Sequence, residues 1–320
     1  MNVSIIIVNY KTPQLCISAI DSIFEKTKGL EYEIIVVDND SRDGSVEKLE
    51  AMFGSRIKVI NSGSNLGFGR ANNIGIENSS GEFVFLLNSD TLLRNNAIKI
   101  LYDFIHSHEN VGVVGANLFS ATGNPIHSYI RDKLTLENEK TPGLITRIYR
   151  KLTFASNNRE FNSTGKPLQI YGYITGADMM IRRTALEKSG QFDPEFFMYS
   201  EEAELTARIM KNGYLIWSVP DAEIYHLEHA SFDPGRINEF KERCLLSGKC
   251  LLYEKLYGKD SVTDLLNVTV KNCKKKIRHS VILLRLKDVK YYNFIKSIAV
   301  EYISAIQRGE DPYRRQQCVR

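Results

Sequence analysis

Short apolar runs alternate with amphipathic segments through the first third of this 320-residue chain. Runs rich in Val, Ile, Leu and Phe predict buried strands at residues 3–9, 33–37, 57–60, 82–87 and 111–116. Between them, apolar side chains recur at helical spacing over residues 13–25, 45–53, 69–78 and 95–107. This alternation predicts an α/β fold, with a mostly parallel sheet that carries helices on both faces.

Three of these strands end in polar side chains. The first ends at Asn9, the second at Asp38 and the fourth beside Asn88, two residues before Asp90. Parallel strands present their carboxyl ends at one sheet edge, where α/β proteins bind ligands. Asp38 is thus a candidate to accept hydrogen bonds from a nucleotide base or ribose, and Asp90 to bind Mg²⁺ or Mn²⁺ on a diphosphate. Taken singly, each residue is also typical of a turn or a helix cap.

A loop with two glycines follows the third predicted strand. It contains Asn65, Gly67 and Arg70, which combine close backbone approach to a ligand with positive charge for a phosphate. The sequence holds no GxxxxGK[ST] loop, and no GxGxxG follows the first strand. A P-loop nucleotide hydrolase and a dehydrogenase are therefore disfavoured.

Two further clusters supply ionisable groups. Glu201 and Glu202 follow four bulky residues, and a carboxylate in a partly apolar pocket has its pKa raised toward that of a useful base. The alternative is an acidic first helical turn that interacts with the helix dipole. His226 closes a strand-like run, where it would complete a metal site with Asp90. The spacing between His226 and His229 is compatible with a zinc site, but no cysteine lies nearby, which disfavours one.

The composition changes near residue 232. Residues 232–320 hold 19 Lys and Arg against 10 Asp and Glu, whereas residues 1–231 hold 23 against 28. We therefore expect a domain over residues 1–231 and a basic, helical C-terminal region over residues 232–320. Its charge favours an anionic partner, such as a membrane surface. The alternative is that its apolar residues pack on the domain or on a second copy in a homodimer.

Cysteine usage and hydropathy bear on the compartment. The five cysteines include no CxxC pair, which argues against a disulfide framework and favours the cytoplasm. Neither a signal peptide nor an apolar run of about 18 residues is found, so we expect a cytoplasmic protein, peripheral at the inner face of the membrane if the basic tail binds lipid. Residues 120–170 lose the regular pattern and are expected to form a long lid or binding loop.

Five segments, taken together, resemble the family 2 inverting glycosyltransferases with a GT-A nucleotide-sugar-binding fold, especially the bacterial rhamnosyltransferase-like branch. They are SIIIVNY at 4–10, VVDNDS at 36–41, NLGF at 65–68, LLNSD at 86–90 and FFMYSEE at 196–202. Their order and spacing make the resemblance specific, and it runs from Val3 to about Ser231. It implies transfer of a sugar from a UDP- or dTDP-linked donor to a hydroxyl of a glycan or lipid-linked glycan, in cell-surface polysaccharide synthesis.

The resemblance also implies a role for each matching residue. Asp90 and His226 would form the metal–diphosphate site, and Glu202 would be the catalytic base with Glu201 beside it. The candidate nucleotide-sugar site comprises Asn9, Asp38, Asn65, Gly67, Arg70 and Asn88. Two departures matter. The metal motif reads Asn-Ser-Asp, which removes one carboxylate and should weaken metal binding, and the base motif is Glu-Glu where Glu-Asp is usual, which changes acceptor placement.

Two other classes remain as alternatives. A nucleotidyltransferase also uses an α/β sheet and Mg²⁺, but the glycine-rich basic loop it needs after the first strand is missing. A non-enzymatic membrane-binding or nucleic-acid-binding module is favoured by the basic cluster at residues 271–278. Since no nucleic-acid-binding motif accompanies that cluster, a nucleic-acid partner is not expected.

Overall fold

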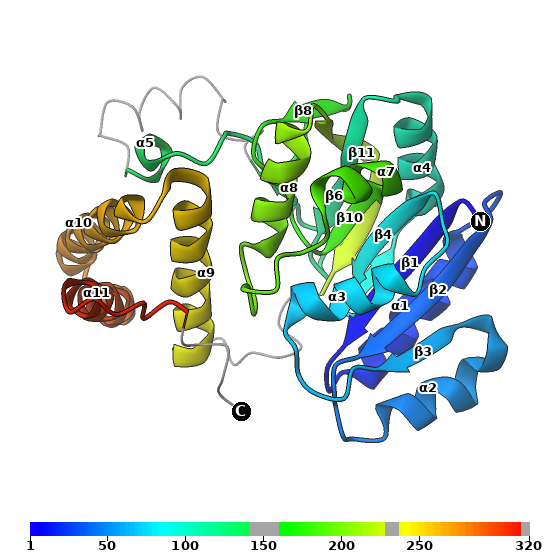
Figure 1. Cartoon of the computed structure of the whole chain (residues 1–320), viewed down its shortest axis with the longest axis horizontal. Helices are drawn as coiled ribbons and strands as arrows, with labels where there is room; N and C mark the ends of the chain where they lie inside the picture. Colours follow the sequence, from blue (N-terminus) through cyan, green and yellow to red (C-terminus); the bar gives the residue numbers. More distant parts are fainter. Residues whose placement is uncertain (141–159, 228–236, 315–320) are drawn as a thin grey trace.

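The computed structural model describes residues 1–140, 160–227 and 237–314, which form an α/β body with long helices at one end (Figure 1). Within these residues the main sheet has nine strands in the order β3-β2-β1-β4-β10-β6-β11-β5, with β8 paired to β11. The strands are β1 (Val3–Asn9), β2 (Tyr32–Asp38), β3 (Lys58–Asn61), β4 (Phe83–Asn88), β5 (Thr91–Leu93), β6 (Val111–Phe119), β8 (Leu168–Ile170), β10 (Asp178–Arg182) and β11 (Leu215–His226). A separate ribbon pairs β7 (Tyr129–Ile130) with β9 (Tyr173–Ile174).

The sheet is parallel in its first half and mixed in its second. β3, β2, β1 and β4 are parallel neighbours, as the alternating pattern predicts. β10 lies antiparallel to both β4 and β6, and β5 and β8 lie antiparallel to β11. β10 follows the irregular excursion rather than a crossover helix, and only parallel neighbours need such a crossover. The predicted α/β class is confirmed, with antiparallel strands added to its second half.

Helices cover both faces of the sheet, as predicted. The helices of the first 211 residues are α1 (Pro13–Lys26), α2 (Ser45–Phe53), the short 3₁₀ helix η1 (Gly54–Arg56), α3 (Phe68–Glu77), α4 (Ala97–Ser107), α5 (Leu136–Glu139), α7 (Arg183–Ser189) and α8 (Glu201–Lys211), as far as the structure describes this part of the chain. The side chains of β1 alternate between two cores. Ile5 and Ile7 pack with α1, α2 and α4, whereas Ile6 packs with α3, α7 and α8.

The expected long loop at residues 120–170 is partly structured. It contains β7, α5 and β8, while residues 141–159 lie outside the described residues. The segment that carries α5 reaches the long helices (Figure 1). The predicted domain boundary at residues 231 and 232, and His229, also lie outside the described residues.

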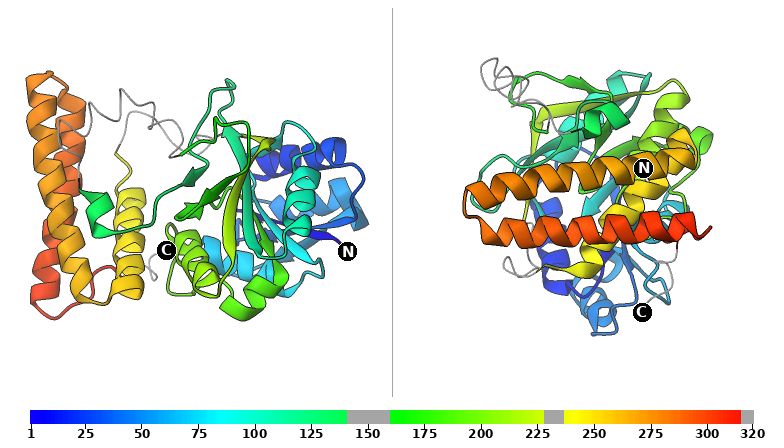
Figure 2. Two further views of the ribbon diagram at one scale, coloured as in Figure 1. Left: turned by 90° about the horizontal axis from the view of Figure 1, so that it is seen from above. Right: turned by 90° about the vertical axis from the view of Figure 1, so that its left-hand side faces the viewer.

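The C-terminal region is helical, as expected, and comprises α9 (Glu239–Tyr257), α10 (Asp260–Ile282) and α11 (Leu286–Gln307). α9 faces the α/β body, and α10 and α11 form an outer layer of two helices side by side (Figure 2). Leu246, Leu251 and Leu252 of α9 are buried in a third core that includes Phe196 and Ala203 of the body. For α9, packing on the α/β body therefore accounts for the apolar face.

Two further observations concern the described residues. None of their helices combines the length and the apolar character needed to cross a bilayer. Their cysteines, Cys16, Cys244, Cys250 and Cys273, are free and buried.

Candidate active site

The ends of β1 and β2 form a buried polar network. Asn9 and Asp38 are register partners, and Asn9 Nδ2 donates to Asp38 Oδ2 at 2.8 Å. The Ser41 hydroxyl donates to the same oxygen at 2.6 Å, and the Ser41 amide donates to Asp38 Oδ1 at 2.9 Å. Both Asn9 and Asp38 are buried. The turn after β2 is thus fixed around a carboxylate.

The loop before α3 is anchored by a residue that the sequence pattern did not single out. The Asn39 side chain donates to Asn65 Oδ1 at 2.9 Å and accepts from the Leu66 amide at 2.9 Å. Asn65 Oδ1 also accepts from the Gly67 amide at 3.2 Å. The Asp-Asn-Asp run after β2 is the sequence signal for Asn39, because a buried asparagine there must pair with neighbouring polar groups.

Gly67 brings this loop against the segment that precedes α8. Its φ is +83°, and a Cβ at this position would lie 2.0 Å from the carbonyl oxygen of Phe197. The Phe68 amide donates to that same carbonyl at 3.0 Å. Glycine is therefore required here both for its backbone conformation and for the close approach.

The two remaining candidates for the donor site have different surroundings. Arg70 donates from Nε to the carbonyl of Pro194 at 2.7 Å, so this nitrogen binds the segment before α8. Asn88 ends β4 as the register partner of Val8, and its amide donates to the carbonyl of Ala177. Asn88 thus lies at the same sheet edge as Asn9 and Asp38, as predicted.

Asp90 and His226 come together although 136 positions separate them in the chain. His226 ends β11 and pairs with Thr91 of β5, which sets His226 Nε2 3.3 Å from Asp90 Oδ1. Both side chains keep part of their surface in solvent, 14% for His226 and 24% for Asp90. The sequence did not predict β5, the short strand that makes this pairing possible.

The pair fits a divalent cation that is shared with a ligand. One carboxylate and one imidazole leave most of an octahedral shell to phosphate oxygens and water, as is usual for Mg²⁺ and compatible with Mn²⁺. Across the described residues, no group of three or more His, Cys, Asp or Glu side chains gathers as a metal cluster. A cation here would therefore depend on the ligand's own oxygens.

The turn into α8 is strained. Tyr199 and Ser200 both have φ of +71°, a conformation that is costly for residues other than glycine. On the far side, Gly248 of α9 packs so closely that a Cβ would lie 2.2 Å from the Tyr199 carbonyl oxygen. The first residues of α8, Glu201 and Glu202, follow this clamped turn directly.

Burial raises the pKa of both glutamates. Loss of water and the neighbouring Glu202 charge raise the pKa of Glu201 well above its ordinary value near 4.5, and Glu201 Oε2 has no hydrogen-bond partner. Burial raises the pKa of Glu202 to about 7, against the opposing effect of backbone amides at Ser200, Glu202 and Ala203. Two adjacent carboxyls that are withdrawn from water do not readily ionise together, and the charge of Glu202 adds to burial in raising the pKa of Glu201.

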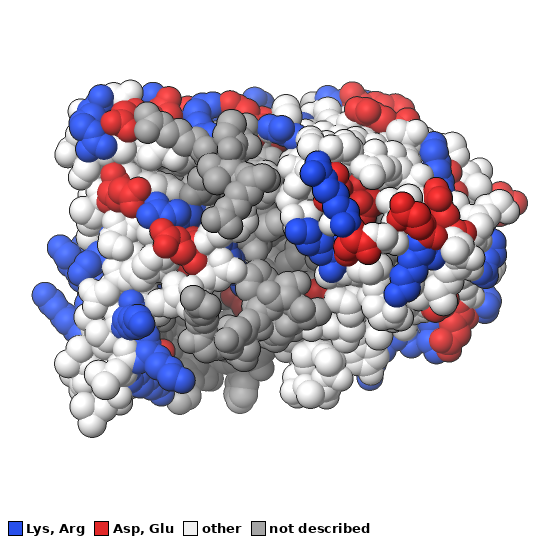
Figure 3. All heavy atoms as spheres, turned by 90° about the horizontal axis from the view of Figure 1, so that it is seen from below, with Lys and Arg blue, Asp and Glu red and all other residues white. Residues whose placement is uncertain are grey.

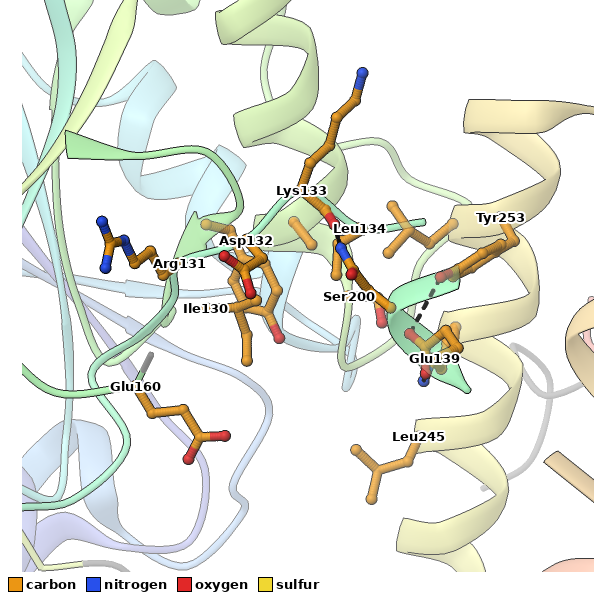
Figure 4. A pocket seen from close by; sticks show the side chains of 15 residues that line it. Ile130, Arg131, Asp132, Lys133, Leu134, Glu139, Glu160, Ser200, Leu245 and Tyr253 are labelled. Carbon is orange, nitrogen blue, oxygen red and sulfur yellow. Dashed lines mark hydrogen bonds and ion pairs between the residues drawn. The ribbon is translucent and has the colours of Figure 1, made fainter. Parts of the chain in front are cut away.

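A cavity of about 530 Å³ opens near the head of α8, between the α/β body and α9 (Figure 4). Ser200 and Ala203, on either side of the glutamates in sequence, line it. Leu245 and Tyr253 project into it from α9, opposite the segment of Ile130 to Leu134 (Figure 4). Tyr253 donates to Glu139 Oε1 at 3.1 Å, and Lys249 pairs with the other oxygen of Glu139.

Sequence reasoning missed two buried groups at this edge. Tyr173 of β9 lines the cavity, and burial together with the charge of Glu202 raises its pKa. Asp178 begins β10 beside the end of β4, accepts from the Ala116 amide at 2.5 Å, and has a pKa raised well above its ordinary value by burial. No local pattern marks either residue, because their neighbours are distant in sequence.

The mixed nine-stranded sheet has the GT-A fold. The sequence model of glycosyl transferase family 2 matches residues 4–190, and the chain belongs to this family. The glycosyltransferase prediction is therefore confirmed over a nucleotidyltransferase and over a non-enzymatic binding module.

The chain is also similar to glycosyltransferases with assigned roles. The chain is 29% identical over 229 residues to the low-salt glycan biosynthesis hexosyltransferase Agl10 of Haloferax volcanii, covering 70% of this chain and 67% of that protein. It is 25% identical over 216 residues to the N-acetylglucosaminyl-diphospho-decaprenol L-rhamnosyltransferase of Mycobacterium tuberculosis, covering 63% and 68%. The crystal structure of GalNAc-T7 with UDP, GalNAc and Mn²⁺ shares the fold, with a TM-score of 0.58, 15% identity, and coverage of 79% of this chain and 48% of that one.

The buried carboxyl of Glu201 leads to a prediction about stability. Its pKa in the folded state exceeds the unfolded value near 4.5, so the folded state binds this proton more tightly and loses stability as pH rises above about 4.5. Because glutamine does not ionise, the Glu201→Gln variant does not lose stability in this way as pH rises. We expect the variant to unfold at least about 2 °C higher than the wild type at pH 8, with the difference vanishing below pH 4.5.

Thermal unfolding followed by circular dichroism across this pH range measures the effect. Glu77→Gln, which changes an exposed glutamate of α3, is the matched control and should leave the unfolding temperature unchanged at every pH. A Glu201→Gln protein that is less stable than the wild type at pH 8 would contradict the assignment of a protonated, uncompensated Glu201.

Proposed function

We propose that the protein transfers a sugar, with inversion at its anomeric carbon, from a UDP- or dTDP-linked donor to a hydroxyl of a glycan or lipid-linked glycan. The observation that carries the proposal is the carboxyl of Glu202, whose pKa is raised to about 7 at the head of α8 beside the cavity. A base with a pKa near the working pH is both available and strong enough to accept a proton in the transition state.

Each of the two glutamates has its own part in this reaction. Glu202 accepts the proton of the acceptor hydroxyl as its oxygen bonds to the anomeric carbon, and the bond from that carbon to the diphosphate breaks on the opposite side. Glu201 stays protonated because of its burial and of the charge on Glu202. A neutral neighbour lets Glu202 ionise without a second negative charge beside it.

The strand-end network would hold the nucleotide. A carboxylate can accept about four hydrogen bonds. Asp38 already accepts from Asn9 and twice from Ser41, so its position is fixed while a lone pair remains for the base or ribose. Asn65, Gly67 and Asn88 lie around it on the neighbouring loop and strand end. Arg70 is proposed to act on the donor through its positive charge, which suits a phosphate.

Asp90 and His226 would hold Mg²⁺ or Mn²⁺ on the donor's diphosphate. The cation would supply neutralisation of the charge that develops on the departing diphosphate. The single carboxylate of the Asn88-Ser89-Asp90 segment predicts weaker binding than a site with two. The Mn²⁺ in the structure of GalNAc-T7 supports a divalent ion at such a site.

The acceptor would occupy the cavity beside Glu202. Its walls combine apolar and aromatic side chains with carboxylates, which suits a sugar ring with several hydroxyl groups. The M. tuberculosis relative is named for a diphospho-decaprenol glycan, which supports a lipid-linked acceptor. Residence in the cytoplasm at the inner face of a membrane belongs to the same proposal, and a homodimer stays a prediction.

Asp90→Ala tests the metal site. Removing the only carboxylate of the pair should abolish the metal-dependent part of diphosphate binding while the fold stays intact, since Asp90 is partly exposed. Calorimetric titration with UDP or dTDP, with and without Mn²⁺, measures this. An affinity in Mn²⁺ equal to that of the wild type would contradict the assignment.

Glu202→Gln tests the base. It should keep donor binding and lower turnover by at least about 10²-fold, the usual scale for loss of a general base. Wild-type turnover should rise with pH up to about 7 and then level, because Glu202 acts as the carboxylate. Glu201→Gln should lower turnover less than Glu202→Gln does, with the same affinity for the donor. If Glu201→Gln is the more damaging change, the base has been assigned to the wrong residue.

Leu245→Trp tests the acceptor cavity. The larger side chain should fill part of the cavity and raise the KM for polyprenyl-diphospho-N-acetylglucosamine by about tenfold or more, with donor affinity and hydrolysis of the donor by water unchanged. Val300→Trp, on the exposed surface of α11, is the control. Equal acceptor KM values for wild type and Leu245→Trp would exclude this cavity as the acceptor site.

A further inference from the structure

The turn between α10 and α11 exposes a continuous set of large apolar side chains. Their exposed fractions are 52% for Val281, 77% for Ile282, 45% for Leu283, 83% for Leu284 and 76% for Leu286. Leu284 lies at the turn itself with φ of +53°. Scattered exposed leucines are ordinary, but a contiguous exposed group usually marks a contact surface. We call residues 281–286 the hairpin tip.

The hairpin tip differs from the rest of the C-terminal region, where exposed large apolar side chains occur singly. α10 and α11 lie side by side as the layer furthest from the sheet, and they are joined at one end of that layer (Figure 2). α9 lies between this layer and the α/β body (Figure 2). The hairpin tip thus lies outside the packed core that the three helices share with the body.

The segment around the hairpin tip is strongly basic. Residues 271–290 contain eight Lys and Arg against a single carboxylate, Asp288. Among the described residues, none of these cations forms an ion pair, although Lys276 lies 4.9 Å from the ring centre of Tyr292. Exposed cations near the tip are Lys271, Lys274, Lys275, Lys276, Arg278, Arg285, Lys287 and Lys290.

Basic residues elsewhere in the same region behave differently. Arg243 pairs with Glu239 and Glu301, Lys255 with Asp193, and Arg314 with Glu254. These contacts join the helices to each other and to the body. The net positive charge of the region is therefore concentrated at the hairpin, and blue side chains gather along the outer edge of the helical end in Figure 3.

We propose that the hairpin tip inserts into the headgroup layer of an anionic lipid bilayer. Apolar side chains flanked by Lys and Arg fit such an interface, since the first enter the acyl boundary while the second meet anionic headgroups. A second copy of this chain fits less well. A two-fold symmetric contact through the tip would bring the two sets of cations together without carboxylates to pair with them.

Only the purpose of this docking rests on the proposed function: docking would give the enzyme access to a lipid-linked acceptor. A second cavity of about 430 Å³ shares Asn138, Glu139 and Lys249 with the acceptor cavity. It extends along α10 and α11 to Lys276 and Tyr292. The two cavities thus lead from the surroundings of Glu202 toward the hairpin, in the direction that a membrane-anchored acceptor would come from.

Vesicle co-sedimentation of the full-length protein tests the proposal. The probes are vesicles of phosphatidylcholine and vesicles that also contain phosphatidylglycerol. We expect at least about tenfold stronger partitioning onto the anionic vesicles at about 0.1 M salt, and most of it lost at about 1 M, where the Debye length falls to about 3 Å. The double variant Ile282→Asp with Leu284→Asp should lower anionic partitioning by about tenfold or more.

Two further variants separate charge from insertion. Lys274→Glu with Lys275→Glu should weaken binding and flatten its salt dependence, whereas Val300→Asp, on exposed α11 surface away from the tip, should bind as the wild type does. All these positions are exposed, so each variant should fold, and thermal unfolding checks this.

Three results would overturn the proposal: equal partitioning onto both kinds of vesicle, no pelleting at low salt, or wild-type binding by the aspartate double variant. A double variant that changes the oligomeric state in gel filtration but binds vesicles normally would make the tip a contact between copies. UDP or dTDP binding is measured in parallel. A wild-type protein that binds neither UDP nor dTDP would count against the proposed function, but it would not affect the proposal of membrane docking.

Discussion

The site depends on one clamped turn, at Tyr199 and Ser200. Gly67, in the loop before α3, approaches Phe197 just ahead of this turn so closely that a Cβ would lie 2.0 Å from its carbonyl oxygen. Gly248 of α9 approaches the turn itself, and a Cβ there would lie 2.2 Å from the Tyr199 carbonyl oxygen. Two successive non-glycine residues at φ of +71° persist only where the surroundings hold them. This clamp fixes the start of α8, and with it both glutamates, relative to the donor loop and to the cavity wall on α9.

The C-terminal region also contacts the segment that precedes α8. Lys255 and Arg314 form ion pairs with acidic residues of the turn segment and of α9, and Phe197 packs edge-on against Phe240 with ring centres 6.1 Å apart. Burial at the start of α8 raises the pKa of Glu201. In the proposed function, a neutral Glu201 lets Glu202 serve as the single ionised carboxyl of the pair.

The sequence predicted the features that depend on local pattern. Apolar runs and helical spacing identified β1, β2, β4 and α1 to α4, and the polar strand ends correctly placed Asn9, Asp38 and Asn88 on one edge. Asp90 and His226 were predicted to meet. In the structure, His226 Nε2 lies 3.3 Å from Asp90 Oδ1. The roles of these residues remain proposals.

The rest depended on contacts between distant segments. β10 carries no mark of its antiparallel place between β4 and β6, so Asp178 and Tyr173 were missed. Bulky residues at 196–199 gave no sign of a left-handed turn, which glycine or asparagine usually marks. The leucines of α9 and of the hairpin tip are alike in sequence, and only the fold distinguishes the buried set from the exposed one.

The central claim is that one of two adjacent buried glutamates, Glu202, ionises near neutral pH while the other stays protonated. Titration of carbon-13-labelled glutamate carboxyls by NMR, in the wild type and in Glu202→Gln, tests it most directly. The account predicts one carboxyl resonance that titrates at about pH 7 in the wild type and is missing from the variant. Glutamate carboxyls that all titrate below about pH 5, as exposed ones do, would contradict it.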